Sequence, residues 1–147
     1  MEMDPNKINV IRQEMSVSQV LRRVRAGEVV FANQYAPFWD VVSRSRLVES
    51  LLVRIPLPCF WIDMFDDRWV ILDGNQRLKI LEHFVDENGF ALAGLEFFKE
   101  LENKTFAQLS RSHQRRIEES DLLFFAIRPE TPVEARPLIW KRIGCFR

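Results

Sequence analysis

The chain has 147 residues, of which 47% are hydrophobic and 29% charged, and its 21 basic side chains are balanced by 21 acidic ones. A chain of this length and apolar content can bury one core, so we expect a single compact domain. The zero formal net charge excludes a global positive field that would draw the protein to nucleic acid, and any such contact must be local.

Cysteine and signal patterns indicate a cytoplasmic protein. Cys59 and Cys145 form neither a CxxC pair nor a disulfide framework, which favours a reducing compartment. The N-terminus lacks the basic and apolar regions of a signal peptide, and no apolar run approaches the ~20 residues needed to cross a bilayer. We therefore expect no membrane contact.

Charged clusters give no clear site. Arginines gather at 22–25, 44–46 and 111–116, but acidic residues are interspersed along most of the chain, which favours solvated faces over a nucleic-acid surface. The two histidines, His83 and His113, lie in no metal-ligand or nuclease pattern.

The first predicted elements are a helix and a short strand. Ser16 and Gln19 form a capping box, and apolar residues follow at helical spacing until Gly27, so we expect a helical N-terminal segment over residues 1–27. The main domain is expected over 28–147. It begins with a brief apolar run that predicts a strand, followed by an aromatic loop broken by proline.

A second helix is predicted from Ser43 to Arg54, ended by Pro56. Its expected inner face is Leu47, Val48, Leu51, Leu52 and Ile55. Two aromatic and β-branched runs then flank Asp66-Asp67, which predicts a β-hairpin, and a further helix should end near Asn88-Gly89. The hairpin aromatics Phe60, Trp61 and Trp69 are expected in the core, whereas Tyr35, Phe38 and Trp39 are better placed to contact a ligand or partner.

The C-terminal part is predicted to hold short helices around one strand. Thr105 is a plausible cap of a short turn, and Ser110 or Ser112 of a short helix through Glu119. Residues 122–127 form a continuous apolar run that predicts a buried strand.

The last helix is expected to open at Thr131-Pro132, with Pro137 kinking or shortening it. Its expected inner face is Val133, Leu138, Ile139 and Ile143. The fold class is then α+β, with a small mixed sheet that contains the hairpin and is packed by several helices.

The hairpin and the helix after it meet in ILDGNQRLKIL, residues 71–81. A strand that enters a helix through a tight turn leaves the first helical N–H groups without internal partners, at the positive end of the helix dipole, and so suits an anion. Gly74 permits close backbone approach, Arg77 adds a donor for phosphate oxygens, and Asp73 can hold Mg²⁺.

A purely structural interpretation of the same residues stays open. Asp73 can serve as the helix N-cap, Gly74 as a turn residue, and Arg77 as a surface partner of Asp73. The five residues alone do not decide between a phosphate site and a capped turn.

The order of motifs resembles the family catalogued as domain of unknown function 262, whose hallmark is a strand ending in DGQQR followed by a helix. The resemblance spans roughly residues 28 to 143. The matching positions are Gln34 and Trp39, Leu47-Val48-Glu49-Ser50, Ile55-Pro56-Leu57-Pro58, Asp73-Gly74-Asn75-Gln76-Arg77, and Arg142-Ile143.

This resemblance implies a ParB/sulfiredoxin-like fold and a regulatory domain that binds, and often hydrolyses, nucleoside triphosphates. Such domains occur in GmrSD-type modification-dependent restriction enzymes and other phage-defence proteins, where turnover regulates an effector nuclease. It implies catalytic roles for Asp73, Gln76 and Arg77, with Asp73 as the Mg²⁺ ligand. The implied nucleotide contacts are Gly74, Asn75, Arg77, Glu49, Ser50 and Gln34, although Glu49 equally suits an exposed helix acid.

Three positions depart from the family pattern; those at 35 and 144 favour binding without turnover, whereas the intact Asp73, Gly74, Gln76 and Arg77 favour hydrolysis. Asn75 replaces a glutamine, Tyr35 stands where an arginine is expected, and Gly144 where an asparagine is expected. The alternative is therefore a catalytically inactive module that docks on an effector protein or makes a weak DNA contact. If the chain is one piece of a larger defence protein, an exposed apolar patch and a homo-oligomer or protein partner are expected.

Overall fold

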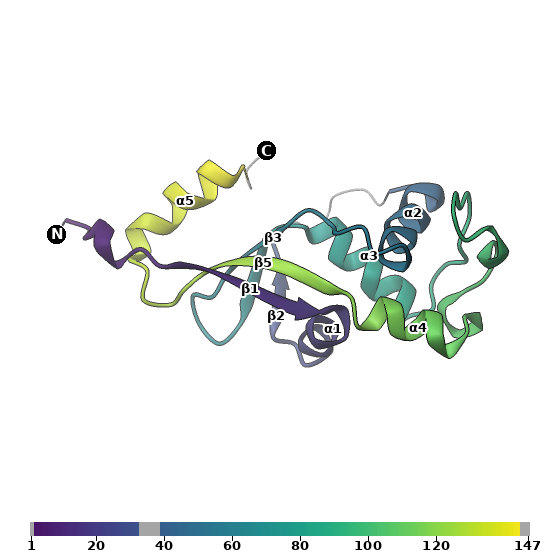
Figure 1. Cartoon of the computed structure of the whole chain (residues 1–147). Helices are drawn as coiled ribbons and strands as arrows, with labels where there is room; N and C mark the ends of the chain where they lie inside the picture. The colour runs from purple at the N-terminus through teal and green to yellow at the C-terminus, as the bar shows by residue number, and fades with distance from the viewer. Residues whose placement is uncertain (1, 33–38, 145–147) are drawn as a thin grey trace.

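The computed structural model describes residues 2–32 and 39–144 and has a mixed α+β architecture (Figure 1). No helix in these ranges is long and apolar enough to span a membrane. The strands are β1 (Val10–Ser16), β2 (Val29–Phe31), β3 (Phe60–Asp63), β4 (Trp69–Asp73) and β5 (Asp121–Ile127). The α-helices are α1 (Val17–Arg25), α2 (Val41–Leu52), α3 (Asn75–Val85), α4 (Arg111–Glu118) and α5 (Arg136–Ile143), and 3₁₀ turns lie at Pro5–Lys7, Lys99–Leu101, Phe106–Gln108 and Val133–Ala135.

All five strands form one mixed sheet in the order β1-β5-β3-β4-β2. The β3–β4 pair is antiparallel, which confirms the predicted hairpin, and β5 lies between β1 and β3, which confirms a buried strand at 122–127. Strand β2 pairs in parallel with β4. The expected small mixed sheet is confirmed.

Strand β1 was not predicted. It pairs antiparallel with β5 along its whole length, from Val10 opposite Ile127 to Ser16 opposite Asp121. Strand β1 lies at the edge of the sheet, and Met15 is its only buried residue. Its sequence, VIRQEMS, is therefore polar and does not resemble a core strand. The first 27 residues therefore contribute a strand to the sheet as well as the predicted helix α1, whose Ser16–Gln19 capping box is confirmed.

Helices α2, α3 and α4 gather at one end of the sheet, and α5 lies at the other end, beside the N-terminal segment (Figure 1). The hydrophobic core is built on aromatic rings and branched aliphatic side chains. Phe60, Phe84 and Phe124 are its largest fully buried members, and the rings of Phe60 and Phe124 stack with centroids 5.1 Å apart. Phe60 and Trp69 are buried as predicted, whereas Trp61, also expected in the core, is only half-buried and packs beside Phe125.

A buried polar cluster attaches α5 to the sheet. Arg136 forms an ion pair with Asp63 of β3, and Trp140 donates a hydrogen bond to the same carboxylate at 2.9 Å. Arg136 also donates to the carbonyls of Arg128, Pro129 and Thr131. Burial of both charges requires this full set of partners, so α5 is held by specific contacts as well as by apolar packing.

The predicted start of the last helix is wrong. A 3₁₀ turn follows Pro132, and α5 begins only at Arg136, with Pro137 in its first turn, where the missing N–H costs nothing. The predicted inner positions Val133 and Leu138 are instead 61% and 55% exposed. Leu138 contributes apolar surface to a groove of about 410 Å³ that Met3 and Ile8 line together with α5.

The predicted caps of the short helices are confirmed. Thr105 caps the 3₁₀ turn at Phe106–Gln108 within a capping box, and the Ser110 hydroxyl accepts a hydrogen bond from the N–H of His113 at the start of α4. Helix α2 begins earlier than predicted because Asp40 caps it, accepting from the N–H of Ser43 at 2.8 Å.

Helix α2 ends in a Schellman motif that has an arginine where glycine is usual. The N–H of Ile55 bonds to the carbonyl of Ser50, and the N–H of Arg54 bonds to that of Leu51. Arg54 has φ 63°, and the only other described non-glycine residues with positive φ are two asparagines, which tolerate this region. The turn leaves Ile55 50% exposed, so its predicted inward position is wrong.

We expect Arg54→Gly to leave the free energy of unfolding unchanged or raise it by about 0.5 kcal/mol. Relief of left-handed strain, roughly 1 kcal/mol, is offset by about 0.5–1 kcal/mol of added chain entropy in the unfolded state. Urea denaturation checks this, with Arg54→Ala as the control that removes the side chain but keeps the strain. A loss above about 1 kcal/mol for the glycine variant would show that the side chain itself stabilises the fold.

Candidate functional site

The junction between β4 and α3 is built around the ring of Phe60. Gly74 is the N-cap residue of α3, is buried and has φ 103°. A Cβ atom at this position would lie 2.2 Å from Cδ2 of Phe60, so only glycine fits. Close packing against Phe60 is therefore one reason for glycine here, alongside the turn that leads into α3.

Arg77 lies on the other side of this contact, with its guanidinium 4.3 Å from the ring centroid of Phe60. It donates hydrogen bonds to the carbonyls of Pro58 and Cys59, the latter at 3.2 Å. Burial lowers the pKa of Arg77, and the nearby Asp73 carboxylate opposes this shift. The predicted surface pair with Asp73 is thus replaced by contacts that fix the chain just before β3.

Asn75 and Gln76 complete the first turn of α3. Asn75 is buried, and its side-chain amide donates to the carbonyl of Ile71 at 3.0 Å, which ties the helix start back to β4. Gln76 is half-buried in the same turn. The amide at position 75 therefore has a structural contact within the junction.

Asp73 is the exposed member of the motif. It ends β4 opposite Trp61 and precedes the N-cap, so the structural interpretation of Asp73 as the cap is wrong. Gly74 has no side chain to accept from the first-turn N–H groups, whereas α1, α2 and α4 are capped by Ser16, Asp40 and Ser110. An exposed carboxylate thus lies next to the positive end of α3.

Glu49, which the resemblance implies as a nucleotide contact, is buried at 3% exposure. Its carboxylate accepts hydrogen bonds from three consecutive backbone N–H groups, those of Glu96, Phe97 and Phe98, at 2.7–3.1 Å. Consecutive N–H groups of this kind form an anion-binding concavity, and here the protein supplies its own anion. The expectation of an exposed helix acid at this position is wrong.

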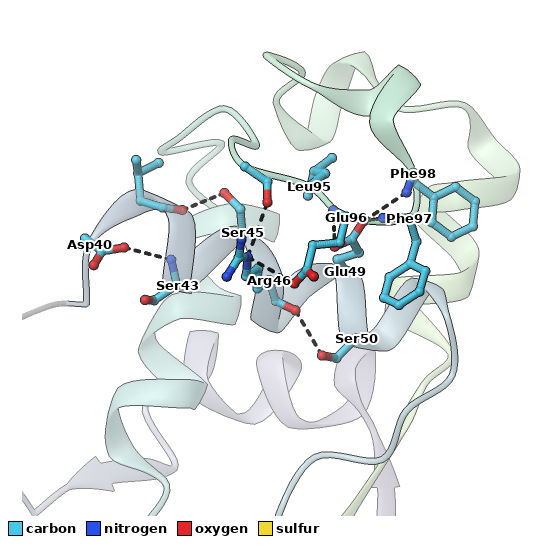
Figure 2. A network of polar contacts seen from close by, with 12 residues as sticks. Asp40, Ser43, Ser45, Arg46, Glu49, Ser50, Leu95, Glu96, Phe97 and Phe98 are labelled. Atoms are coloured by element: carbon cyan, nitrogen blue, oxygen red, sulfur yellow. Dashed lines mark hydrogen bonds and ion pairs between the residues drawn. The ribbon is translucent and has the colours of Figure 1, made fainter.

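Residues around Glu49 bind the same loop. Arg46 pairs with Glu96 at 3.3 Å and donates to the carbonyl of Gly94 (Figure 2). The hydroxyl of Ser45 accepts from the N–H of Ala93 and donates to Val41 within α2. These contacts attach the irregular segment 93–98 to α2, and no sequence pattern had indicated them.

The remaining nucleotide contacts implied by the resemblance are Ser50 and Gln34. The hydroxyl of Ser50 donates to the carbonyl of Arg46 one turn earlier, so it is engaged within α2. Gln34 and the neighbouring Tyr35 lie outside the described residues. In the described part of the chain, no three His, Cys, Asp or Glu side chains are grouped as a metal site. The structure therefore brings together residues 73–77, while Glu49 contacts the 96–98 loop.

The chain matches no protein-family model, no curated protein and no solved structure. The resemblance to the domain of unknown function 262 family thus rests on the motifs quoted above.

We expect Gly74→Ala to lower the free energy of unfolding by about 3 kcal/mol, because the added methyl group both clashes with Phe60 and strains a left-handed backbone. Urea denaturation measures the loss. Gly27→Ala is the matched control, since Gly27 also has positive φ but nothing lies within 4 Å of its added Cβ. Equal losses in the two variants would contradict the packing argument.

We expect Glu49→Gln to lower the free energy of unfolding by about 2 kcal/mol at pH 7, because a neutral amide accepts less strongly from the three N–H groups. Burial opposes ionisation, but these N–H groups and Arg46 together hold the pKa of Glu49 below its usual 4.5. The carboxylate therefore stabilises the fold above pH 4.5, and this contribution is lost as the pH falls through the lower folded-state pKa. Denaturation at several pH values should show the difference between wild type and variant shrinking on acidification, and a constant difference would contradict the assignment.

Proposed function

We propose that the β4–α3 junction binds the triphosphate of a nucleoside triphosphate together with Mg²⁺. The chain would then act as a nucleotide-binding regulatory domain with a ParB/sulfiredoxin-like fold, in a prokaryotic phage-defence or modification-dependent restriction system. The observation that carries the proposal is the exposed carboxylate of Asp73 beside the start of α3, whose N-cap is a glycine. The system and the fold family rest on the sequence resemblance alone.

The charge arrangement favours a metal-bridged anion. The positive end of α3 attracts phosphate, but the Asp73 carboxylate beside it repels phosphate when no cation is present. Mg²⁺ is commonly held by one or two carboxylates plus substrate phosphates and waters, so a single aspartate is enough for a metal that arrives with the nucleotide. Binding should therefore require Mg²⁺.

The contacts of Arg77 support a positioning role for this residue. Its guanidinium donates to the Pro58 and Cys59 carbonyls and covers Phe60, so it supports the turn that presents Asp73 and the helix start. Gln76, half-buried in the first turn, is then the residue assigned to orient a phosphate oxygen or a water. With Arg77 engaged by the backbone, binding is the primary activity and turnover depends on Gln76.

Calorimetric titration of the four common ribonucleoside triphosphates, with Mg²⁺ and with EDTA, tests the proposal. We expect wild type to bind at least one of them at least tenfold more tightly with Mg²⁺, and Asp73→Asn to lose this dependence while still binding, because the repulsive charge and the metal ligand disappear together. Phosphate release measured on wild type and Gln76→Ala then separates turnover from binding.

Asp66→Asn is the matched control, because Asp66 is an exposed aspartate in the β3–β4 turn, away from α3. It should bind like wild type. No binding of any triphosphate at millimolar concentration, or the same Mg²⁺ dependence in Asp73→Asn as in wild type, would overturn the proposal.

A further inference from the structure

A groove of about 620 Å³ lies between the C-terminal end of α2 and helix α4. We call it the arginine groove. Its charged lining consists of four arginines, Arg54, Arg111, Arg115 and Arg116, against two acids, Glu119 and Asp121. The whole chain is formally neutral, so this is a local concentration of positive charge of the kind that a neutral protein needs for contact with an anionic polymer.

One face of α4 supplies three of the four arginines. Positions 111 and 115 lie four residues apart on this face with 112 and 116 in the adjacent row, and Glu119 and Ser120 follow directly after the helix. Arg111 and Arg115 are like charges at this spacing, which destabilises a helix by a few tenths of a kcal/mol. Arg115 and Arg116 lie in the last turn of α4, where basic side chains stabilise the helix dipole, so helix stability accounts for these two arginines but not for Arg111 at the first helical position.

Two of the arginines have structural partners. Arg116 donates to the carbonyl of Leu52 at 3.1 Å and so offsets the negative end of α2 where it meets the groove. Arg111 pairs with Glu118 at 2.7 Å. These contacts hold two guanidinium groups in place at the wall of the groove. Arg111 is the first residue of α4 and so lies at the positive end of the helix dipole.

The other two arginines have no such contacts. Within residues 2–32 and 39–144, neither Arg54 nor Arg115 forms an ion pair or a side-chain hydrogen bond, and both are exposed. Arg54 also occupies the left-handed position where glycine would be less strained. Arg54 thus keeps a strained backbone although its side chain makes no contact that stabilises the fold, which points to a role of the side chain in binding.

We propose that the arginine groove binds the phosphodiester backbone of a nucleic acid without reading its base sequence. Arginine and serine are the residue types that contact phosphate oxygens, and the groove holds four arginines with Ser112, while the hydroxyl of Ser120 donates to the Arg116 carbonyl. Among the described residues that line the groove, none is an asparagine, a glutamine or an aromatic residue that could pair with or stack on bases. Leu51, Ile55 and Pro56 form an apolar wall suited to the sugar.

Fluorescence anisotropy with labelled 20-nucleotide single-stranded and duplex DNA, from 50 to 300 mM NaCl, tests this inference. The variants are Arg54→Gly and Arg115→Gln, with Arg68→Gln as the control. Arg68 is exposed in the β3–β4 turn, so all three variants lose one positive charge. Circular dichroism and urea denaturation confirm that each variant is folded.

We expect wild type to bind DNA of unrelated sequences equally. Each groove variant should bind about tenfold more weakly at 50 mM salt, because one phosphate contact is lost. For the same reason, the slope of the log association constant against log salt concentration should become less negative by about 1. Arg68→Gln should bind like wild type. Equal losses in all three variants would show a net-charge effect only, and no binding by wild type at 50 mM salt and 100 µM protein would also overturn the inference.

This outcome is independent of the nucleotide site. Asp73→Asn changes the β4–α3 junction and none of the groove residues, so it should bind DNA like wild type. Loss of DNA binding in Asp73→Asn with retention in Arg54→Gly and Arg115→Gln would place the DNA contact at the junction and contradict the groove.

Discussion

The ring of Phe60 is the contact on which both the sheet and the candidate site depend. It is fully buried in β3, stacks on Phe124 of β5, and closes the space where a Cβ at Gly74 would lie. The guanidinium of Arg77 covers the same ring and binds the carbonyls of the two residues before it. One aromatic side chain therefore sets the distance between the central strands and the start of α3.

Two charged residues that resemble ligand-binding positions serve instead to satisfy irregular backbone. Glu49 accepts from three N–H groups of the 96–98 loop, and Arg77 donates to two carbonyls of the 58–59 segment. Because an unpaired buried N–H or C=O is costly, such residues are as necessary to the fold as the apolar core. What remains for chemistry at the junction is the exposed Asp73, the helix start and Gln76 in its first turn.

The two proposed sites use different electrostatic strategies. At the junction a carboxylate lies beside a helix N-terminus, which suits an anion only when a divalent cation accompanies it. In the arginine groove, Arg54 and Arg115 are exposed to solvent, which suits a phosphate backbone without metal. A neutral protein can support both because each charge distribution is local.

Local sequence signals determined much of the secondary structure. The capping box at Ser16, the cap at Thr105, the hairpin around Asp66-Asp67 and the apolar strand at 122–127 were predictable, because caps, turns and apolar runs act over a few residues. Strand β1 was not, because an edge strand with polar residues is defined only by its partner β5, more than 100 positions away.

The candidate site, too, was predictable from the sequence in part only. The sequence by itself placed residues 73–77 at a strand-to-helix junction, since the change of hydrophobic period marks that boundary. Only the tertiary structure decided what Glu49, Gly74 and Arg77 contact, and it alone joined Arg54 to Arg111, Arg115 and Arg116. Such contacts depend on how irregular loops return to the helices, and no periodic pattern records that path.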